Sequence, residues 1–243
     1  MLLRRVTKHV KEQNWFAVGV DFLIVVVGVF IGIQVANWND ARSDVRVGDD
    51  YLRGLHADLS ADAAMLAFEI EARHQQLEDA EVVLEFFDGR ALDTNVFFGR
   101  YISAIISNNT QPNRNTMQEV LSSGNLRLIR EPKIRTGLLE LYALYESIAL
   151  TEAHLARDFD TYLYDTTFSI IPVQFEGPWD DTAANRAAAQ ALLDNIAVEN
   201  GLRLILVNLD FNGSGIIANL EVAQHQVFTL LEEIENALDK PRL

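Results

Sequence analysis

The strongest constraint on the fold is an apolar run near the N-terminus. Between residues 22 and 36 the only polar residue is Gln34. The flanking tryptophans, Trp15 and Trp38, lie about 34 Å apart along an α-helix that rises 1.5 Å per residue. This length matches a hydrocarbon core of about 30 Å with an aromatic residue at each interface. We therefore expect a transmembrane helix over residues 15–38, surrounded by a lipid bilayer.

The charges differ on the two sides of this run. Residues 1–14 contain one acidic residue, Glu12, and four basic residues, which are Arg4, Arg5, Lys8 and Lys11. The whole chain has a formal net charge of −15, so the acidic excess follows the run. The positive-inside rule then predicts a basic cytoplasmic segment over residues 1–14 and an acidic extracytoplasmic domain over residues 39–243. We expect a bacterial inner-membrane protein whose C-terminal domain is periplasmic.

Two alternatives to a retained anchor exist for this segment. A cleaved signal peptide would share the basic start and the apolar run. However, the run is longer than a usual signal core, and residues 35–37 are the nearest match to a small-x-small cleavage site. A buried core helix would explain the apolar residues but not the one-sided charge or the paired tryptophans. The retained anchor accounts for all of these features.

One face of the expected span collects small residues together with the only acidic residue of the span. At 100° per residue, six positions fall within an arc of about 100°. These positions are Ala17, Asp21, Gly28, Gly32, Val35 and Ala36. Gly28 and Gly32 form a GxxxG pattern, which Ala36 extends. Helices in lipid associate through close backbone packing, so this face is a candidate contact for another membrane helix.

Asp21 lies about 9 Å inside the Trp15 end of the span, at 1.5 Å per residue. An ionised aspartate at mid-bilayer costs about 2.5–3.5 kcal/mol on insertion scales. Either Asp21 sits at the headgroup boundary in contact with water, or it pairs with a donor such as Arg, Lys or His. Because the chain has one expected span, that donor would belong to a second copy or to a different integral membrane protein.

The composition excludes several classes of partner and chemistry. Asp and Glu number 35 against 20 Lys and Arg, and an acidic body repels phosphates, so we expect no nucleic-acid partner. The chain contains no cysteine. Disulfides, thiolate metal sites and cysteine nucleophiles are therefore excluded.

Beyond Trp38, apolar residues spaced by three and four predict helices throughout. The expected helices cover residues 49–88, 94–108, 115–124, 131–170, 183–195, 197–212 and 214–240. Gly89 and Gly124 are expected to end two of them. The run LRLILVNL, residues 202–209, is assigned to helix rather than to a buried strand. The expected fold is all-α: one N-terminal transmembrane helix followed by an irregular antiparallel helical bundle.

The sequence contains no HExxH, Walker, GxGxxG or GxSxG motif. Glu71 and His74 have the i, i+3 spacing of di-metal bundles, but such sites need a second pair and two further glutamates. Asp158, Asp160 and Asp165 could bind a hard cation, although a charged helix face explains them better. We predict no catalytic residue, no metal site and no cofactor, and we expect a non-enzymatic protein.

Two stretches resemble a bacterial family of single-pass membrane proteins of unknown function. The first, DFLIVVVGVFIGIQVANWNDAR, ends its apolar run in Gln34, Asn37, Trp38 and Asn39, as that family's Gln-x-x-Asn-Trp-Asn ending does. The second, residues 116–147, contains a Ser-Gly helix end, a hydrophobic turn and an Arg-bearing helix, which are similar to the equivalent family segment. The resemblance implies a membrane-anchored helical protein and supplies no activity, cofactor or site.

The leading functional hypothesis is an accessory or assembly subunit of a larger integral membrane complex, of which an energy-transducing complex is one example. Its span would dock onto other membrane helices, and its periplasmic domain would cover the outer face of the partner. A homo-oligomeric periplasmic sensor or binding module is the first alternative. A helical metal protein or enzyme is the second.

Overall fold

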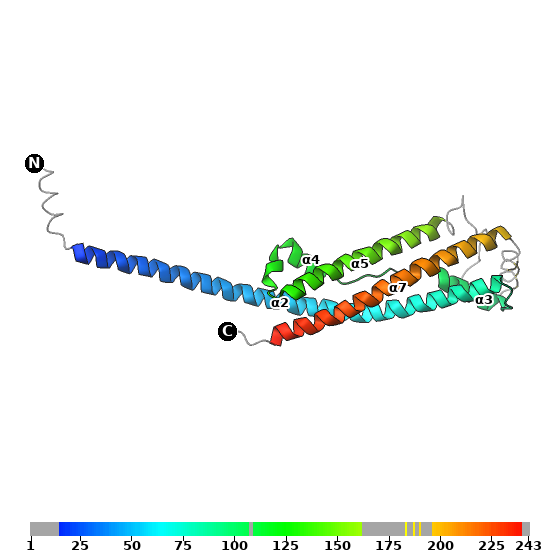
Figure 1. Cartoon of the computed structure of the whole chain (residues 1–243), viewed down its shortest axis with the longest axis horizontal. Helices are drawn as coiled ribbons and strands as arrows, with labels where there is room; N and C mark the ends of the chain where they lie inside the picture. Colours follow the sequence, from blue (N-terminus) through cyan, green and yellow to red (C-terminus); the bar gives the residue numbers. More distant parts are fainter. Residues whose placement is uncertain are drawn as a thin grey trace, which may run out of the picture. The chain divides into compact units, whose positions relative to one another are not determined.

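The computed structural model describes residues 15–106, 109–161, 183, 187, 190 and 196–239. Over this part of the chain the secondary structure is entirely helical, which confirms the all-α prediction (Figure 1). The elements are α2 (Trp15–Phe87), α3 (Thr94–Ile105), α4 (Asn115–Ser122), the 3-10 helix η1 (Asn125–Leu128), α5 (Pro132–Phe159) and α7 (Ile196–Asp239). The expected helix over residues 183–195 and the end of the one over 131–170 lie outside the described residues.

The chain divides into two compact units, residues 1–50 and 51–243. The described part of the first unit is the N-terminal portion of α2. In this portion, every side chain from Val18 to Arg42 is exposed. The expected span is therefore helical from Trp15 onward, and the same helix continues without a break to Phe87.

The second unit is built on three long helices that lie side by side: the later part of α2, α5 and α7 (Figure 1). Helices α5 and α7 are antiparallel. At one end Gly137 of α5 lies against Leu230 of α7, and at the other end Asp158 accepts a hydrogen bond from Asn208. This arrangement is the antiparallel bundle that the sequence predicts.

Helix α7 is also antiparallel to α2. His56 of α2 contacts Glu235 near the end of α7, and Leu77 lies against Gly213 near its middle. Apolar side chains from α2, α3, α4, α5 and α7 fill the space between the helices. Fully buried examples are Leu55, Leu59, Leu66, Phe97, Phe98, Met117, Leu138, Leu141, Leu209, Leu220 and Val227. Burial of such side chains is worth about 1.5–3 kcal/mol each and is the main force that closes the bundle.

Two predicted helix ends occur at the expected glycines. Gly89 follows α2 with a φ of 100°, and Gly124 follows α4 with a φ of 70°. After α2, the Arg90 N–H donates to the Glu85 carbonyl at 3.0 Å, which is the six-to-one bond of a Schellman end. This bond requires a left-handed backbone conformation at residue 89, and glycine adopts that conformation without a steric penalty.

Helix α7 joins two predicted helices, 197–212 and 214–240, into one. The run LRLILVNL is helical, as expected, and the helix continues through Gly213 and Gly215. Gly213 has a packing role, because a Cβ atom built there would lie 2.8 Å from Leu77 Cδ2. A glycine that would suggest a helix end in the sequence thus marks a close approach to α2.

Candidate functional site

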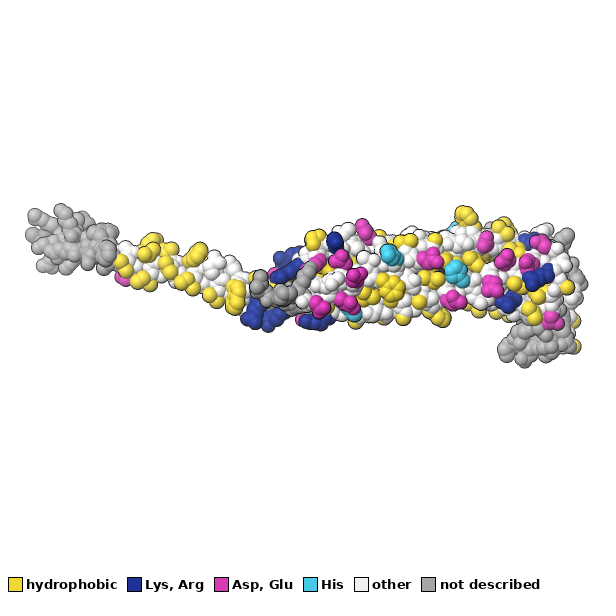
Figure 2. Space-filling model, turned by 60° about the horizontal axis from the view of Figure 1, so that its bottom comes forward, with side chains coloured by type: hydrophobic (Ala, Val, Ile, Leu, Met, Phe, Trp, Pro, Cys, Tyr) yellow, Lys and Arg dark blue, Asp and Glu magenta, His cyan; other side chains and the backbone are white. Residues whose placement is uncertain are grey.

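The exposed apolar part of α2 is the candidate site predicted from the sequence. Its most apolar window has a mean hydropathy of 2.5, and none of that window is buried. Among the described helices it is the one that is both long and apolar enough to cross a membrane. Figure 2 shows its apolar side chains following one another along the helix surface. Phe22 and Phe30, for example, are 70 % and 61 % exposed.

The small residues of the predicted packing face leave the helix backbone accessible. A Cβ atom built on Gly28 or Gly32 would meet no other atom within 4 Å. Ala36 and Asp21 are exposed, so the four residues form one open strip along the continuous helix. A second helix can approach such a strip closely enough for backbone and side-chain packing in lipid. The side chain of Ala17, predicted to share this face, lies outside the described part.

Trp38 marks one end of the expected span. Its indole is 65 % exposed, and the Arg42 guanidinium carbon lies 5.8 Å from the centre of its ring. The cation and the aromatic face attract one another at this distance. Arg42 was missed by the sequence analysis, although its i, i+4 spacing from Trp38 is a signal that could have found it. The side chain of Trp15, the other predicted interface residue, lies outside the described part.

The second unit contains a buried ion pair that sequence reasoning also missed. Arg73 Nη2 of α2 lies 2.7 Å from Glu152 Oε1 of α5. Glu152 Oε1 also accepts the Thr110 hydroxyl at 2.7 Å, and Oε2 accepts the Thr110 N–H at 3.0 Å. Both carboxylate oxygens are therefore engaged. The arrangement fastens the segment before α4 to the bundle.

Two aspartates of α2 hold the same connecting segment further along. Asp62 accepts the Asn113 N–H at 2.8 Å and the Tyr145 hydroxyl at 3.0 Å. Asp58 accepts the Thr116 N–H at 3.0 Å. Burial raises the pKa of the Asp62 carboxyl above 3.8, against the opposing effect of these hydrogen bonds. The pKa of the Tyr145 hydroxyl is raised, by burial first and by the Asp62 charge second.

The described residues that were considered for metal chemistry lie on α2 and at the C-terminal end of α5. Glu71 and His74 are both exposed on α2. Within the described ranges no three His, Cys, Asp or Glu side chains come together in a group that could hold a metal ion. Asp158 is bound to Asn208 at 2.7 Å, and Asp165 lies outside the described residues.

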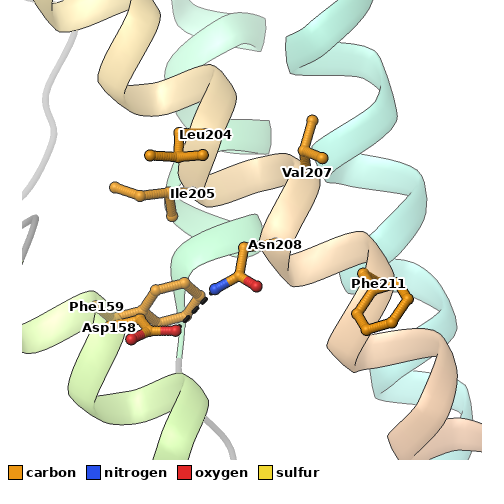
Figure 3. A pocket seen from close by; sticks show the side chains of 7 residues that line it. All are labelled: Asp158, Phe159, Leu204, Ile205, Val207, Asn208 and Phe211. Atoms are coloured by element: carbon orange, nitrogen blue, oxygen red, sulfur yellow. Dashed lines mark hydrogen bonds between the residues drawn. The ribbon is translucent and has the colours of Figure 1, made fainter.

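A cavity of about 400 Å³ opens between the end of α5 and the start of α7 (Figure 3). Its lining consists of Asp158, Phe159, Leu204, Ile205, Val207, Asn208 and Phe211. The two polar residues of the lining bond to each other, and the rest are apolar. The wall of the cavity is therefore mostly apolar.

No protein-family model matches the chain, and neither the curated proteins nor the solved structures provide a match.

Proposed function

We propose that this protein is a membrane-anchored interaction protein, whose N-terminal helix docks onto other membrane helices as an accessory or assembly subunit of an integral membrane complex. One observation carries the proposal: the apolar part of α2 is exposed along its length and has an open strip of small residues at Gly28 and Gly32. An apolar helix left uncovered needs lipid, and a glycine strip on it favours helix contact.

The charge distribution supports an orientation for this anchor. Basic residues precede the apolar run, and the chain as a whole is strongly acidic. In the proposed arrangement the N-terminal segment is cytoplasmic, and residues 39–243 lie in the periplasm of a bacterial cell. Trp38 and Arg42 then lie at the outer interface, where aromatic and basic side chains are commonly found.

The docking hypothesis is tested by comparing glycine variants of the span. Gly28→Leu with Gly32→Leu fills the open strip on one face. Gly19→Leu is the matched control, because Gly19 points about 180° away from Gly28 on the helix and is equally open. Partners are recovered from native membranes in mild detergent and identified by mass spectrometry. We expect the paired substitution to remove them and the control to retain them. Equal recovery with both variants would refute docking through this face.

Asp21 gives a second test of the same face. Asp21→Leu is expected to insert into the membrane as the unaltered protein does, because it removes a charge from an apolar segment. If Asp21 pairs with a donor on another subunit, the variant loses the partners recovered with the unaltered chain. Retention of all partners would indicate that Asp21 is hydrated at the membrane–water interface and has no partner residue in the membrane.

The proposed topology is tested with reporters and by direct mass measurement. Alkaline phosphatase fused after Leu243 is expected to be active, and a fluorescent protein fused at the same place to be dark, when that end is periplasmic. The intact mass of membrane-extracted protein distinguishes a retained anchor from a cleaved signal. A mass that lacks the residues up to about Ala36 would rule out the anchor.

A further inference from the structure

Exposed cations gather at the end of the second unit where its first helical residues lie. Arg127 of η1, Arg130, and Lys133 in the first turn of α5 are all exposed. One acidic residue, Glu131, lies among them in the sequence, although the whole chain has a formal charge of −15. Figure 2 shows Lys and Arg side chains together at this end. We call Arg127, Arg130 and Lys133 the basic corner.

The backbone of the basic corner is fastened to the bundle on both sides. The Tyr51 hydroxyl accepts a hydrogen bond from Asn125 Nδ2 at 3.0 Å, which joins η1 to the first residue of the second unit. Arg135 Nη1 donates to the carbonyl oxygens of Ile129 and Arg130 at 2.6 and 3.0 Å, which closes the turn from η1 into α5. Ile129 is fully buried. The cations are therefore carried by an ordered turn of the folded unit.

The charges of the basic corner are little used within the chain. In the described ranges, neither Arg127 nor Arg130 forms a side-chain ion pair. Lys133 Nζ lies 3.6 Å from a Glu233 carboxylate oxygen, but the lysine side chain is 83 % exposed. An ion pair as exposed as this one contributes little to stability. All three cations are thus accessible to an anion outside the chain.

Other cations of the second unit are neutralised by carboxylates of the same unit. Four arginines in α2, α3, α7 and the turn after α2 each contact an acidic side chain. These pairs are Arg73 with Glu152, Arg90 with Glu85, Arg100 with Asp79, and Arg203 with Asp88. The basic corner differs from them, because its cations do not serve the packing of the bundle.

The place of the basic corner in the chain indicates a membrane surface as its partner. Tyr51, to which η1 is bonded, follows Trp38 by 13 residues, which is about 20 Å of helix at 1.5 Å per residue. Phe87, at the end of α2, is a further 36 residues away, or about 54 Å. The cations therefore occur at the end of the unit that the chain connects most directly to the expected span. Anionic lipid headgroups attract Lys and Arg that lie within about a Debye length of the bilayer surface.

An apolar side chain accompanies the cations. Leu121, near the end of α4, is 50 % exposed, and α4 is in contact with η1. Segments that lie on a membrane surface commonly combine basic residues with exposed apolar ones. The acidity of the rest of the chain opposes a broad contact with anionic lipid, so the attraction is confined to this corner.

We propose that the basic corner binds anionic phospholipid headgroups of the membrane that holds the span, and so docks this end of the second unit on the bilayer surface. The inference rests on the membrane anchor of the proposed function, but it requires no partner protein. Because the span already holds the chain in the bilayer, the headgroup contact is intramolecular in effect, and a few cations are sufficient. Added salt is expected to weaken the contact, since it screens exposed charges.

Energy transfer from the protein to labelled lipid headgroups tests the contact in the full chain, which has no natural cysteine. Ser122→Cys, exposed at the end of α4, carries the donor dye, and Ala153→Cys, exposed near the other end of α5, is the control position. The protein is reconstituted into vesicles of phosphatidylcholine alone or of phosphatidylcholine with phosphatidylglycerol. We expect phosphatidylglycerol to raise the transfer from residue 122 more than from residue 153, and high salt to remove the rise.

Charge variants of the labelled chain assign the effect to the basic corner. The triple variant Arg127→Gln, Arg130→Gln and Lys133→Gln is expected to lose the rise in energy transfer. The matched control removes the same number of positive charges near the opposite end of the unit: Arg90→Gln, Arg157→Gln and Arg203→Gln. Circular dichroism checks that both are folded. An equal loss in the two triple variants would show a response to total charge and would overturn the proposal.

Flotation of the same vesicles separates the basic corner from the anchor. A chain that floats with both kinds of vesicle but shows no change in transfer would overturn the basic corner and leave the anchor in place. A chain that floats only with anionic vesicles, and not after the corner is neutralised, would support the corner and refute the anchor. If the neutralised corner leaves the transfer unchanged but loses a protein partner from native membranes, its ligand is an acidic protein surface and the lipid proposal fails.

Discussion

Arg73 and Glu152 form a buried ion pair between two helices of the bundle, with 2.7 Å between Nη2 and Oε1 and side chains 2 % and 3 % exposed. The two residues are far apart in the chain, so their contact joins α2 to α5. Thr110 supplies two further hydrogen bonds to the carboxylate. A buried charge is tolerated when it is paired and hydrogen-bonded, and the Glu152 carboxylate has both kinds of support.

Removing one member of this pair is expected to destabilise the bundle strongly. Arg73→Met keeps the length of the side chain but leaves the Glu152 carboxylate buried without its cation. We expect a loss of about 3–5 kcal/mol in the free energy of unfolding. Urea denaturation of the full chain in mild detergent, followed by circular dichroism, measures this loss.

The double variant Arg73→Met with Glu152→Met is the control for the charge itself. It buries two apolar side chains in place of two ions, so its loss should be smaller than that of Arg73→Met alone. The single variant Glu152→Met completes the comparison. If the double variant loses as much free energy of unfolding as Arg73→Met and Glu152→Met lose together, the two ions act independently, contrary to the structure.

Asp62 is expected to make stability depend on pH. Burial raises the pKa of its carboxyl in the folded protein above 3.8, so the folded state retains a proton that the unfolded chain has lost. This contribution to stability is complete below pH 3.8 and is lost as the pH rises through the raised folded pKa. Asp62→Asn cannot ionise. The free energy of unfolding of the unaltered chain, relative to the variant, should therefore fall as the pH rises from below 3.8 through the raised pKa of the folded protein.

Urea denaturation of both proteins at a series of pH values checks this sign. Glu69, whose pKa burial also raises, is present in both chains, so its contribution largely cancels in the difference. A relative stability that increases with pH would mean that the hydrogen bonds from Asn113 and Tyr145 outweigh burial.

The helical fold was predictable because apolar residues recur at the helical period through the chain. The ends of α2 and α4 were predictable from Gly89 and Gly124, whose left-handed conformations favour glycine. The continuity of α7 was not predicted, because the pair Gly213 and Gly215 suggested a boundary. Packing of Leu77 against Gly213 gives the first glycine a tertiary role that no local pattern encodes.

The polar interior of the second unit could not be predicted in the same way. Asp62 is bound to Asn113 and Tyr145, which lie 51 and 83 residues away in the sequence. An acidic residue on a helix is usually solvated, and only the tertiary arrangement shows which ones accept buried N–H groups. The face of the span was predictable because all of its residues lie on one helix, where spacing alone determines which positions share a side.

Asp58 is expected to act as a cap for a helix to which it does not belong. Arg114, at the start of α4, makes no capping hydrogen bond with its side chain, and Asp58 of α2 accepts the Thr116 N–H of the first turn instead. Asp58→Ala should lower the free energy of unfolding by about 1 kcal/mol, the usual value of a capping acceptor. Asp58→Asn retains an acceptor and should recover much of the loss. Glu71→Ala, an exposed acid on the same helix, is the control, and an equal loss there would contradict a capping role.

Gly213 and Gly99 are expected to respond differently to the same substitution. Alanine stabilises a helix interior relative to glycine by about 0.5–1 kcal/mol when nothing obstructs its methyl group. A Cβ atom at Gly99 of α3 would meet nothing within 4 Å, so Gly99→Ala should raise the free energy of unfolding by that amount. At Gly213 it would lie 2.8 Å from Leu77 Cδ2, so Gly213→Ala should gain less or lose stability.

The effect of the contact with Leu77 is isolated by repeating Gly213→Ala in a chain in which residue 77 has a shorter side chain. In a chain that already carries Leu77→Ala, the obstructing methyl groups are absent, and Gly213→Ala should recover the full gain of about 0.5–1 kcal/mol. Thermal or urea denaturation of the four chains gives the coupling between the two sites. The same effect of Gly213→Ala in both backgrounds would mean that the close approach of α7 to α2 does not depend on this glycine. A difference in the expected direction would show why a helix of this length retains glycine where the sequence alone suggests a break.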